Sequence, residues 1–454
     1  MVSSDKKQIH RHYRRYLIPT VVSMIAHSIY CLADVFFVAW GVGSDGLAAL
    51  NIALPIFTFY SCFSLMVGVG TATTISVCKG VGDDYSANQT LTMAYLLLLS
   101  VGAVAAVVGS IWLDNIAQML GAPEELVPLV HDYLVVINAT AFMYILSSAS
   151  AVIIRCDENP KLVMVATTIG NITNIVLDFV FVILCKWSVF GAGLATAIGP
   201  CATVAILSVH FLKKQNTVRF VKKFFHFSLF GRIFKNGIGT SIMEVSSGIV
   251  ILFINKALLK VSGPDSVAIF SIISNIAYVG KGVFNGIAQA AQPIISRSYG
   301  SKNYRAIHIV NRHALLITAV FSLGIYGVIC LFPSTIITTF VSHEPAIVVA
   351  GTTAILLYFL SFPFTGLNTV IMYYFQSMER PRSTMMISIL RGVALVYLFL
   401  QILPVFWGEN GVWLSLFGAE FITFGIFFPL HLRFGKKQQK AAEESYSQTL
   451  LEPS

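Results

Sequence analysis

Long apolar segments with few or no charged residues recur along the whole chain, and they constrain its fold more than any other feature. Each is about as long as the roughly 20 residues that a helix needs to cross the hydrocarbon core of a bilayer. Strands of membrane barrels are only about ten residues long and alternate in polarity, so these lengths favour helices. Twelve spans are predicted, at residues 16–39, 46–78, 87–112, 133–154, 162–185, 190–212, 236–255, 266–296, 313–333, 346–376, 383–403 and 411–431.

The overall composition agrees with a chain embedded in lipid. Of the 454 residues, 56% are hydrophobic and 11% are charged, whereas soluble domains carry roughly 25% charged residues. In a soluble protein the net charge of +9 would be consistent with nucleic-acid binding, but here the basic residues lie between the apolar segments. We therefore expect the lipid bilayer, and no nucleic acid, as a partner.

The positions of Lys and Arg predict the orientation of the spans, because basic residues gather in cytoplasmic loops. With a cytoplasmic N-terminus, 25 of the 30 basic residues lie inside and 3 lie outside, namely Lys186, Lys256 and Lys260. The remaining two, Lys281 and Arg391, lie within spans. An odd number of spans in the middle of the chain would abolish this bias. We expect both termini in the cytoplasm and a multi-pass protein of the plasma membrane, the inner membrane of a bacterium.

The two halves of the chain resemble each other at several places. Matching residues near the ends of the second and eighth spans are 218 positions apart, and those at the starts of the sixth and twelfth spans are 220 apart. The pairs are Gly68 and Gly286, Ala72 and Ala290, Lys79 and Arg297, Gly82 and Gly300, and Gly191 and Gly411. Because each half has an even number of spans, the repeat is parallel, with its axis along the membrane normal.

These observations predict an all-α membrane protein with two pseudo-symmetric six-helix bundles, V-shaped around a central cavity. The expected organisation is a tail at 1–15, a bundle at 16–212, a linker at 213–235, a bundle at 236–431 and a tail at 432–454. Such an architecture suits alternating access. No nucleotide-binding or hydrolase motif appears, so we expect a transporter driven by H⁺ or Na⁺ with no other cofactor, and not an enzyme.

Six ionisable residues lie inside predicted spans. A charge at the centre of a spanning helix costs at least about 2.5–3.5 kcal/mol, so each is a candidate functional group. They are Asp34, Asp178, Glu244, Lys281, Arg391 and Glu420. Glu420 is expected to pair with Arg391 as a structural contact. Glu244 either binds a substrate or cation, or forms an ion pair with Lys281 or Arg391.

Asp34 and Asp178 are predicted to lie at similar depth, since both are about 25–28 Å along outward-running helices. Asn174 is one turn before Asp178, and Asn171 shares the same face. Thr196 in the sixth span can reach the same level. Carboxylate, amide and hydroxyl oxygens suit a hard cation or a proton. The alternative is that Asp34 reaches the interface and is merely solvated.

Separated motifs resemble the multidrug and toxic compound extrusion (MATE) family of the multidrug/oligosaccharidyl-lipid/polysaccharide flippase superfamily. The first span ends D-V-F-F-V from Asp34, the second ends G-V-G-T-A-T-T-I-S-V-C-K-G-V-G-D from Gly68, and the fifth contains G-N-I-T-N-I-V-L-D from Gly170. The resemblance covers residues 14–434. It implies efflux of drugs or metabolites, in exchange for sodium ions or protons.

The resemblance also implies roles for particular residues. It places the coupling ion at Asp34, Asn174, Asp178 and Thr196, with Na⁺ as a candidate between the two carboxylates. It links Glu244 to substrate or a second cation, and Pro19 to bending of the first span.

Aromatic and sulfur-containing side chains could form a soft cavity for aromatic cations. Tyr144, Met243 and Phe284 are candidates, together with Asn171, although such side chains can equally face lipid. The expected substrate is a small organic compound, cationic or amphipathic, and the expected state is a monomer.

Two other functions fit parts of the pattern. A lipid-linked oligosaccharide flippase of the same superfamily would be expected to carry extra spans and a cationic cavity, whereas four of the six intramembrane charges here are acidic. A receptor or scaffold without transport would need neither an internal repeat nor a buried pair of carboxylates.

Overall fold

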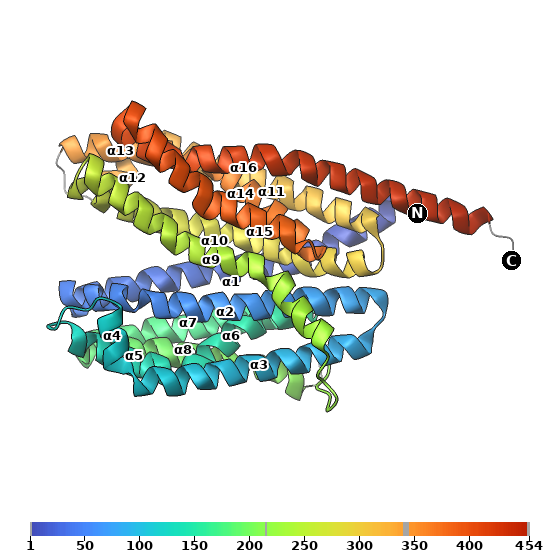
Figure 1. Cartoon of the computed structure of the whole chain (residues 1–454), viewed down its shortest axis with the longest axis horizontal. Coiled ribbons are helices and arrows are strands. Elements are labelled where there is room, and N and C mark those ends of the chain that lie inside the picture. Colours follow the sequence, from blue (N-terminus) through green and yellow to red (C-terminus); the bar gives the residue numbers. More distant parts are fainter. Residues whose placement is uncertain (1, 214–215, 339–344, 452–454) are drawn as a thin grey trace. The chain divides into compact units, whose positions relative to one another are not determined.

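The computed structural model describes residues 2–213, 216–338 and 345–451, which form helices joined by turns and short loops, with no strand among them (Figure 1). The first half contains α1 (Val2–Gly41), α2 (Ser44–Val81), α3 (Asp84–Ile111), α4 (Leu113–Met119), α5 (Val127–Ala139), α6 (Ala141–Cys156), α7 (Pro160–Asp178), the π-helical turn η1 (Phe179–Leu184) and α8 (Ser188–Leu212). The second contains α9 (Phe227–Val261), α10 (Pro264–Gly300), α11 (Tyr304–Leu331), α12 (Pro333–Thr338), α13 (Pro345–Phe359), α14 (Phe362–Ser377), α15 (Pro381–Ile389), the π-helical turn η2 (Leu390–Ala394) and α16 (Leu395–Leu451).

Twelve spans are present in the described part of the chain, as predicted. Ten helical segments are long and apolar enough to cross a membrane, and α5 with α6 forms an eleventh span, bent by 56°. One of the ten, Pro381–Lys440, has 60 residues, and at 1.5 Å per residue it would be about 90 Å long. That is twice the thickness of a bilayer with its headgroups. The backbone leaves helical geometry at Gly408, with φ 53°, and this kink divides the segment into two spans.

The internal repeat is visible in the helix boundaries. Equivalent helices begin 220 residues apart in the two halves, at Ser44 and Pro264 for α2 and α10, and at Asp84 and Tyr304 for α3 and α11. The short helices that follow them, α4 and α12, begin at Leu113 and Pro333, again 220 residues apart. Since every element type recurs in the same order, each half is one copy of the same six-span design.

The caps of α3 and α11 also correspond. The Asp83 carboxylate accepts a hydrogen bond from the backbone N–H of Ser86, and the Asn303 side chain accepts one from Ala306. Each satisfies a free N–H in the first turn of its helix. The hydrogen bonds from Ser86 hold the pKa of Asp83, which lies between two spans, below its ordinary value.

The chain divides into two compact units by internal contacts. The N-terminal unit comprises Ile18–Glu244, and the C-terminal unit comprises Val245–Ser454 together with Met1–Leu17. Two helices, α1 and α9, therefore each contribute to both units. Helix α9 begins at Phe227, inside the expected linker, and α16 continues to Leu451, through most of the expected C-terminal tail.

Candidate carboxylate site

Three helices of the N-terminal unit bring the four predicted coupling-ion residues together. Asp34 comes from α1, Asn174 and Asp178 from α7, and Thr196 from α8. The Thr196 hydroxyl lies 3.5 Å from Asp34 Oδ1 and donates to it, and Asn174 Nδ2 donates to the Thr196 hydroxyl at 3.4 Å. The carboxyl groups of Asp34 and Asp178 are close enough to interact directly. Their role in ion coupling stays a prediction.

The Asp178 carboxyl group has the most unusual environment of the four. Its side chain is fully buried, with 0% of its surface exposed, and neither of its oxygens has a hydrogen-bond donor among the described residues. The side-chain oxygen of Asn174, which is 2% exposed, also lacks a donor. Buried polar atoms are nearly always satisfied. These three oxygens are therefore an exception that calls for an explanation.

A change in helix geometry follows directly after Asp178. Helix α7 ends there and the chain continues as the π-helical turn η1. The equivalent span of the C-terminal unit contains the π-helical turn η2, with Arg391 inside it. Such turns are uncommon and occur frequently at functional sites. Neither turn contains a proline, and only η2 contains a glycine, Gly392.

Glycines allow α7 and α8 to approach closely enough for Asn174 to reach Thr196. A β-carbon added at Gly170 would lie 2.0 Å from Thr203 Oγ1 and 2.8 Å from the backbone oxygen of Gly199. One added at Gly199 would lie 3.0 Å from the backbone oxygen of Gly170. The close packing of these two helices thus depends on the absence of side chains.

We expect Gly170→Val to push α7 away from α8 and to lower both stability and efflux. Overpacking of this kind typically costs about 1–3 kcal/mol. Thermal unfolding in detergent and drug efflux from cells would measure the two effects. Gly425→Val is the matched control, because a β-carbon there meets nothing within 4 Å. Equal behaviour of the two variants would contradict this account of the α7–α8 contact.

Polar side chains continue along α1 and α7 from the carboxylates. Ser23 and Thr167 are hydrogen-bonded through their hydroxyl oxygens, 2.7 Å apart. Asn171 lies between that contact and Asn174 on α7, is partly buried, and has no acceptor for its Nδ2 among the described residues. The seam between α1 and α7 is therefore polar over several turns, which is rare next to lipid.

A second polar cluster in the N-terminal unit includes Glu244, which is the last residue of that unit. Glu244 interacts electrostatically with His27 of α1 and with Tyr144 of α6. The Tyr144 hydroxyl lies 3.0 Å from the hydroxyl of Ser61. The sequence interpretation missed His27, although it precedes Asp34 by two helical turns and so shares its face. Tyr133, whose phenol lies within electrostatic range of Asp34 and Asp178, was also missed.

The remaining candidates occupy different surroundings. Met243 is partly buried in α9, next to Glu244. Pro19 lies inside α1, two residues past the last N-terminal residue that groups with the C-terminal unit. Phe284 is 1% exposed and packs in the core of the C-terminal unit, with its ring centroid 5.5 Å from that of Phe362. A side chain enclosed in this way is part of the hydrophobic core and offers almost no surface to a substrate.

Two of the three intramembrane charges of the C-terminal unit compensate each other. The Arg391 guanidinium binds Glu420 Oε1 through Nη2 at 2.8 Å and through Nε at 3.1 Å. It also donates to the Thr369 hydroxyl at 3.0 Å, while Asn368 Nδ2 donates to Glu420 Oε2 at 2.7 Å. The predicted Arg391–Glu420 pair is present. Lys281 instead lies 3.5 Å from the Tyr358 hydroxyl.

Comparison with known proteins shows which family the sequence matches. The family model MatE matches residues 19–180 and 238–400, one stretch in each half of the chain. The multidrug export protein MepA of Staphylococcus aureus (strain MRSA252) is 24% identical over 432 residues, covering 92% of both chains. MepA of Staphylococcus haemolyticus (strain JCSC1435) is 25% identical over 427 residues, with the same coverage.

Solved structures share the fold. An outward-facing multidrug resistance MATE family transporter has a TM-score of 0.89 and 23% identity, over 94% of this chain and 96% of the other. A transporter of the same superfamily from Pyrococcus furiosus has a TM-score of 0.88 and 23% identity, over 95% and 97%. Proteins of this family are secondary transporters and not enzymes. With more than half of its residues matched by the family model, the chain belongs to the MatE family of membrane transporters.

Proposed function

We propose that this transporter exports small organic compounds in exchange for H⁺ or Na⁺ that binds at Asp34 and Asp178. The observation that carries the proposal is the buried carboxyl group of Asp178, whose oxygens have no donor among the described residues. A group in that state gains from a proton or a cation more than from any other partner. The relatives named multidrug export proteins support drug-like substrates.

Coupling would follow from the difference in affinity between two conformations. An ion can shift a conformational equilibrium only if it binds one state more tightly than the other. Occupancy of the carboxylate pair would change how α1 packs on α7 and α8, since Asp34 accepts a hydrogen bond from Thr196 of α8 and α1 also meets α7 at Ser23 and Thr167. Release of substrate and binding of the ion would then be linked reciprocally.

The cluster around Glu244 supports a cationic or amphipathic substrate. The cluster combines the Glu244 carboxylate with aromatic rings. The ring centroid of Tyr144 lies 5.7 Å from that of Phe57 and 6.4 Å from that of Tyr60. Aromatic faces and a negative charge together attract organic cations. The proposal includes a monomer in the plasma membrane of a bacterium, with both termini in the cytoplasm, as the distribution of basic residues favours.

We expect Asp34→Asn to abolish ethidium efflux from cells that express the protein. The amide cannot bind a proton at physiological pH, and it offers no negative charge to a cation. Asp45→Asn is the matched control. It makes the same change of charge at a residue that is exposed in the first turn of α2. Undiminished efflux by Asp34→Asn at equal expression would refute the coupling role.

The nature of the ion would be determined in proteoliposomes with independently imposed pH and sodium gradients. Efflux that follows the pH gradient alone would identify the proton, and efflux that requires sodium at constant pH would identify Na⁺. Flux that responds to neither gradient would contradict the antiport proposal.

A further inference from the structure

A basic and aromatic segment, residues 216–226, joins α8 to α9 in the N-terminal unit without regular secondary structure. We call it the strap. Its backbone is held against α3. The N–H of Arg219 donates to Asn88 Oδ1 at 2.7 Å, and the N–H of Val221 donates to the Thr92 hydroxyl at 3.0 Å. Val218, directly before Arg219, is completely buried. The strap is thus a fixed part of the unit.

Further contacts hold both ends of the strap. The backbone N–H of Thr217 donates to the Asp157 carboxylate at 3.0 and 3.2 Å. At the other end, Gln89 Nε2 donates to the backbone oxygen of Lys223 at 2.9 Å. Because these bonds use backbone atoms of the strap, its basic side chains are not needed to hold it in place.

The strap lies at the depth of lipid headgroups. Helix α3 has 28 residues, so it is about 42 Å long at 1.5 Å per residue. That matches the roughly 40–45 Å of a bilayer including its headgroup layers. The strap contacts Asn88, Gln89 and Thr92 in the first turns of α3, and the Phe220 ring reaches Tyr95, with centroids 5.4 Å apart. With about 30 Å of hydrocarbon, each headgroup layer takes about 5–8 Å, so Asn88 and Gln89, about 6–8 Å along α3, lie in that layer. Thr92 and Tyr95, about 12–17 Å along, lie at the level of the acyl chains.

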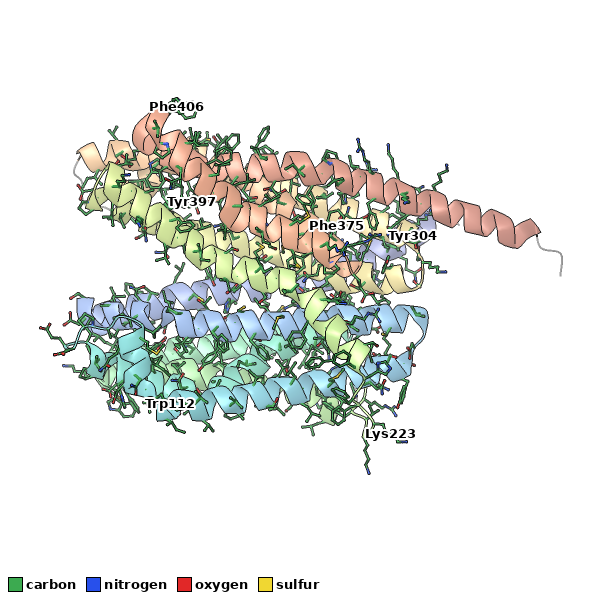
Figure 2. All side chains as sticks on the ribbon, in the orientation of Figure 1. Trp112, Lys223, Tyr304, Phe375, Tyr397 and Phe406 are labelled. Carbon is green, nitrogen blue, oxygen red and sulfur yellow. The ribbon has the colours of Figure 1, made fainter. Side chains whose placement is uncertain are left out.

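The side chains that the strap leaves exposed are basic or aromatic. Arg219, Lys222 and Lys223 are exposed, and none forms an ion pair with any described carboxylate. Figure 2 shows the Lys223 side chain extending away from the ribbon. Phe225 is 66% exposed, and Phe227, which follows the strap, is 79% exposed. Exposed rings beside uncompensated cations are unfavourable in water but suit the boundary between headgroups and acyl chains.

We propose that the strap binds an anionic phospholipid of the adjacent leaflet. The guanidinium of Arg219 and the ammonium groups of Lys222 and Lys223 would contact its phosphate and headgroup, while Phe225 and Phe227 enter the acyl boundary. Basic side chains next to a span attract anionic lipids through the surface potential of the membrane. This site is separate from the carboxylates and does not depend on the proposed coupling.

The test is the binding of fluorescent phosphatidylglycerol to the purified full-length protein in neutral detergent, followed by anisotropy. Fluorescent phosphatidylcholine serves as the zwitterionic reference. We expect tighter binding of phosphatidylglycerol, weakened by salt. Each basic side chain should contribute roughly fivefold in affinity, so the triple variant Arg219→Gln, Lys222→Gln, Lys223→Gln should lose on the order of 100-fold.

The matched control is Lys186→Gln, Lys256→Gln, Lys260→Gln, which removes the same charge from three exposed residues outside the strap. It should retain the preference, and unchanged melting temperatures would verify folding of both variants. Equal binding of the two lipids by the unaltered protein, or retained preference in the strap variant, would overturn the proposal. Competition by soluble glycerol phosphate as effective as the lipid would also overturn it, because the Phe rings would then have no role.

Discussion

Asp178→Asn should make the protein more stable and at the same time inactive in ion-driven efflux. The carboxyl group is fully buried and neither oxygen has a donor among the described residues. Its ionised form therefore lacks compensation, and removing an unsatisfied buried charge typically relieves about 1–3 kcal/mol. The amide has nearly the same size and no charge. Thermal unfolding in detergent would show a higher melting temperature, and proteoliposome flux would fall to the level of empty vesicles.

Asp157 supplies the comparison, because it is also buried but fully partnered. It is 3% exposed and accepts hydrogen bonds from the backbone of Thr217 and, at 2.7 Å, from His210 Nε2. Asp157→Asn should lower the melting temperature, since a charge-assisted hydrogen bond is lost. If the melting temperature rises in Asp178→Asn and falls in Asp157→Asn, Asp178 is retained for its function although it lowers stability. A destabilised Asp178→Asn would mean that the carboxylate has a structural role.

Arg391→Met should be among the most destabilising single substitutions in the chain. It would leave Glu420 buried without its cation, beside Asn368 and Thr369, which belong to the same network. Breaking a buried ion pair by removing one partner typically costs about 3–5 kcal/mol. The loss would be seen as a lower melting temperature in detergent.

The double variant Arg391→Met, Glu420→Met tests whether the loss of stability comes from leaving Glu420 buried without its cation. Replacing both partners by apolar residues of similar size is often neutral or stabilising, so the double variant should recover most of the stability lost in Arg391→Met. If its loss equals the sum of the two single losses, the two side chains do not interact. Residual efflux in the double variant would show that the C-terminal pair is structural.

The number of spans and their repetition could be predicted from the sequence, because hydrocarbon tolerates only backbone that is hydrogen-bonded within the same segment. Apolar length therefore translates directly into helices. The bends could not be predicted. The break between α5 and α6 at Thr140 and the π-helical turns after Asp178 and around Arg391 coincide with no proline or glycine pair.

The sequence alone determined which ionisable groups lie in the membrane, because each one interrupts an apolar segment of known length. Only the tertiary structure decided which of them have partners. Glu420 is matched by Arg391 and Asn368, whereas Asp178 is left without a donor among the described residues. In the sequence, both residues are simply carboxylic acids within apolar segments, and nothing there distinguishes them. The physical reason is that partners come from helices that are distant along the chain, so a small difference in packing decides whether a buried carboxylate has a donor.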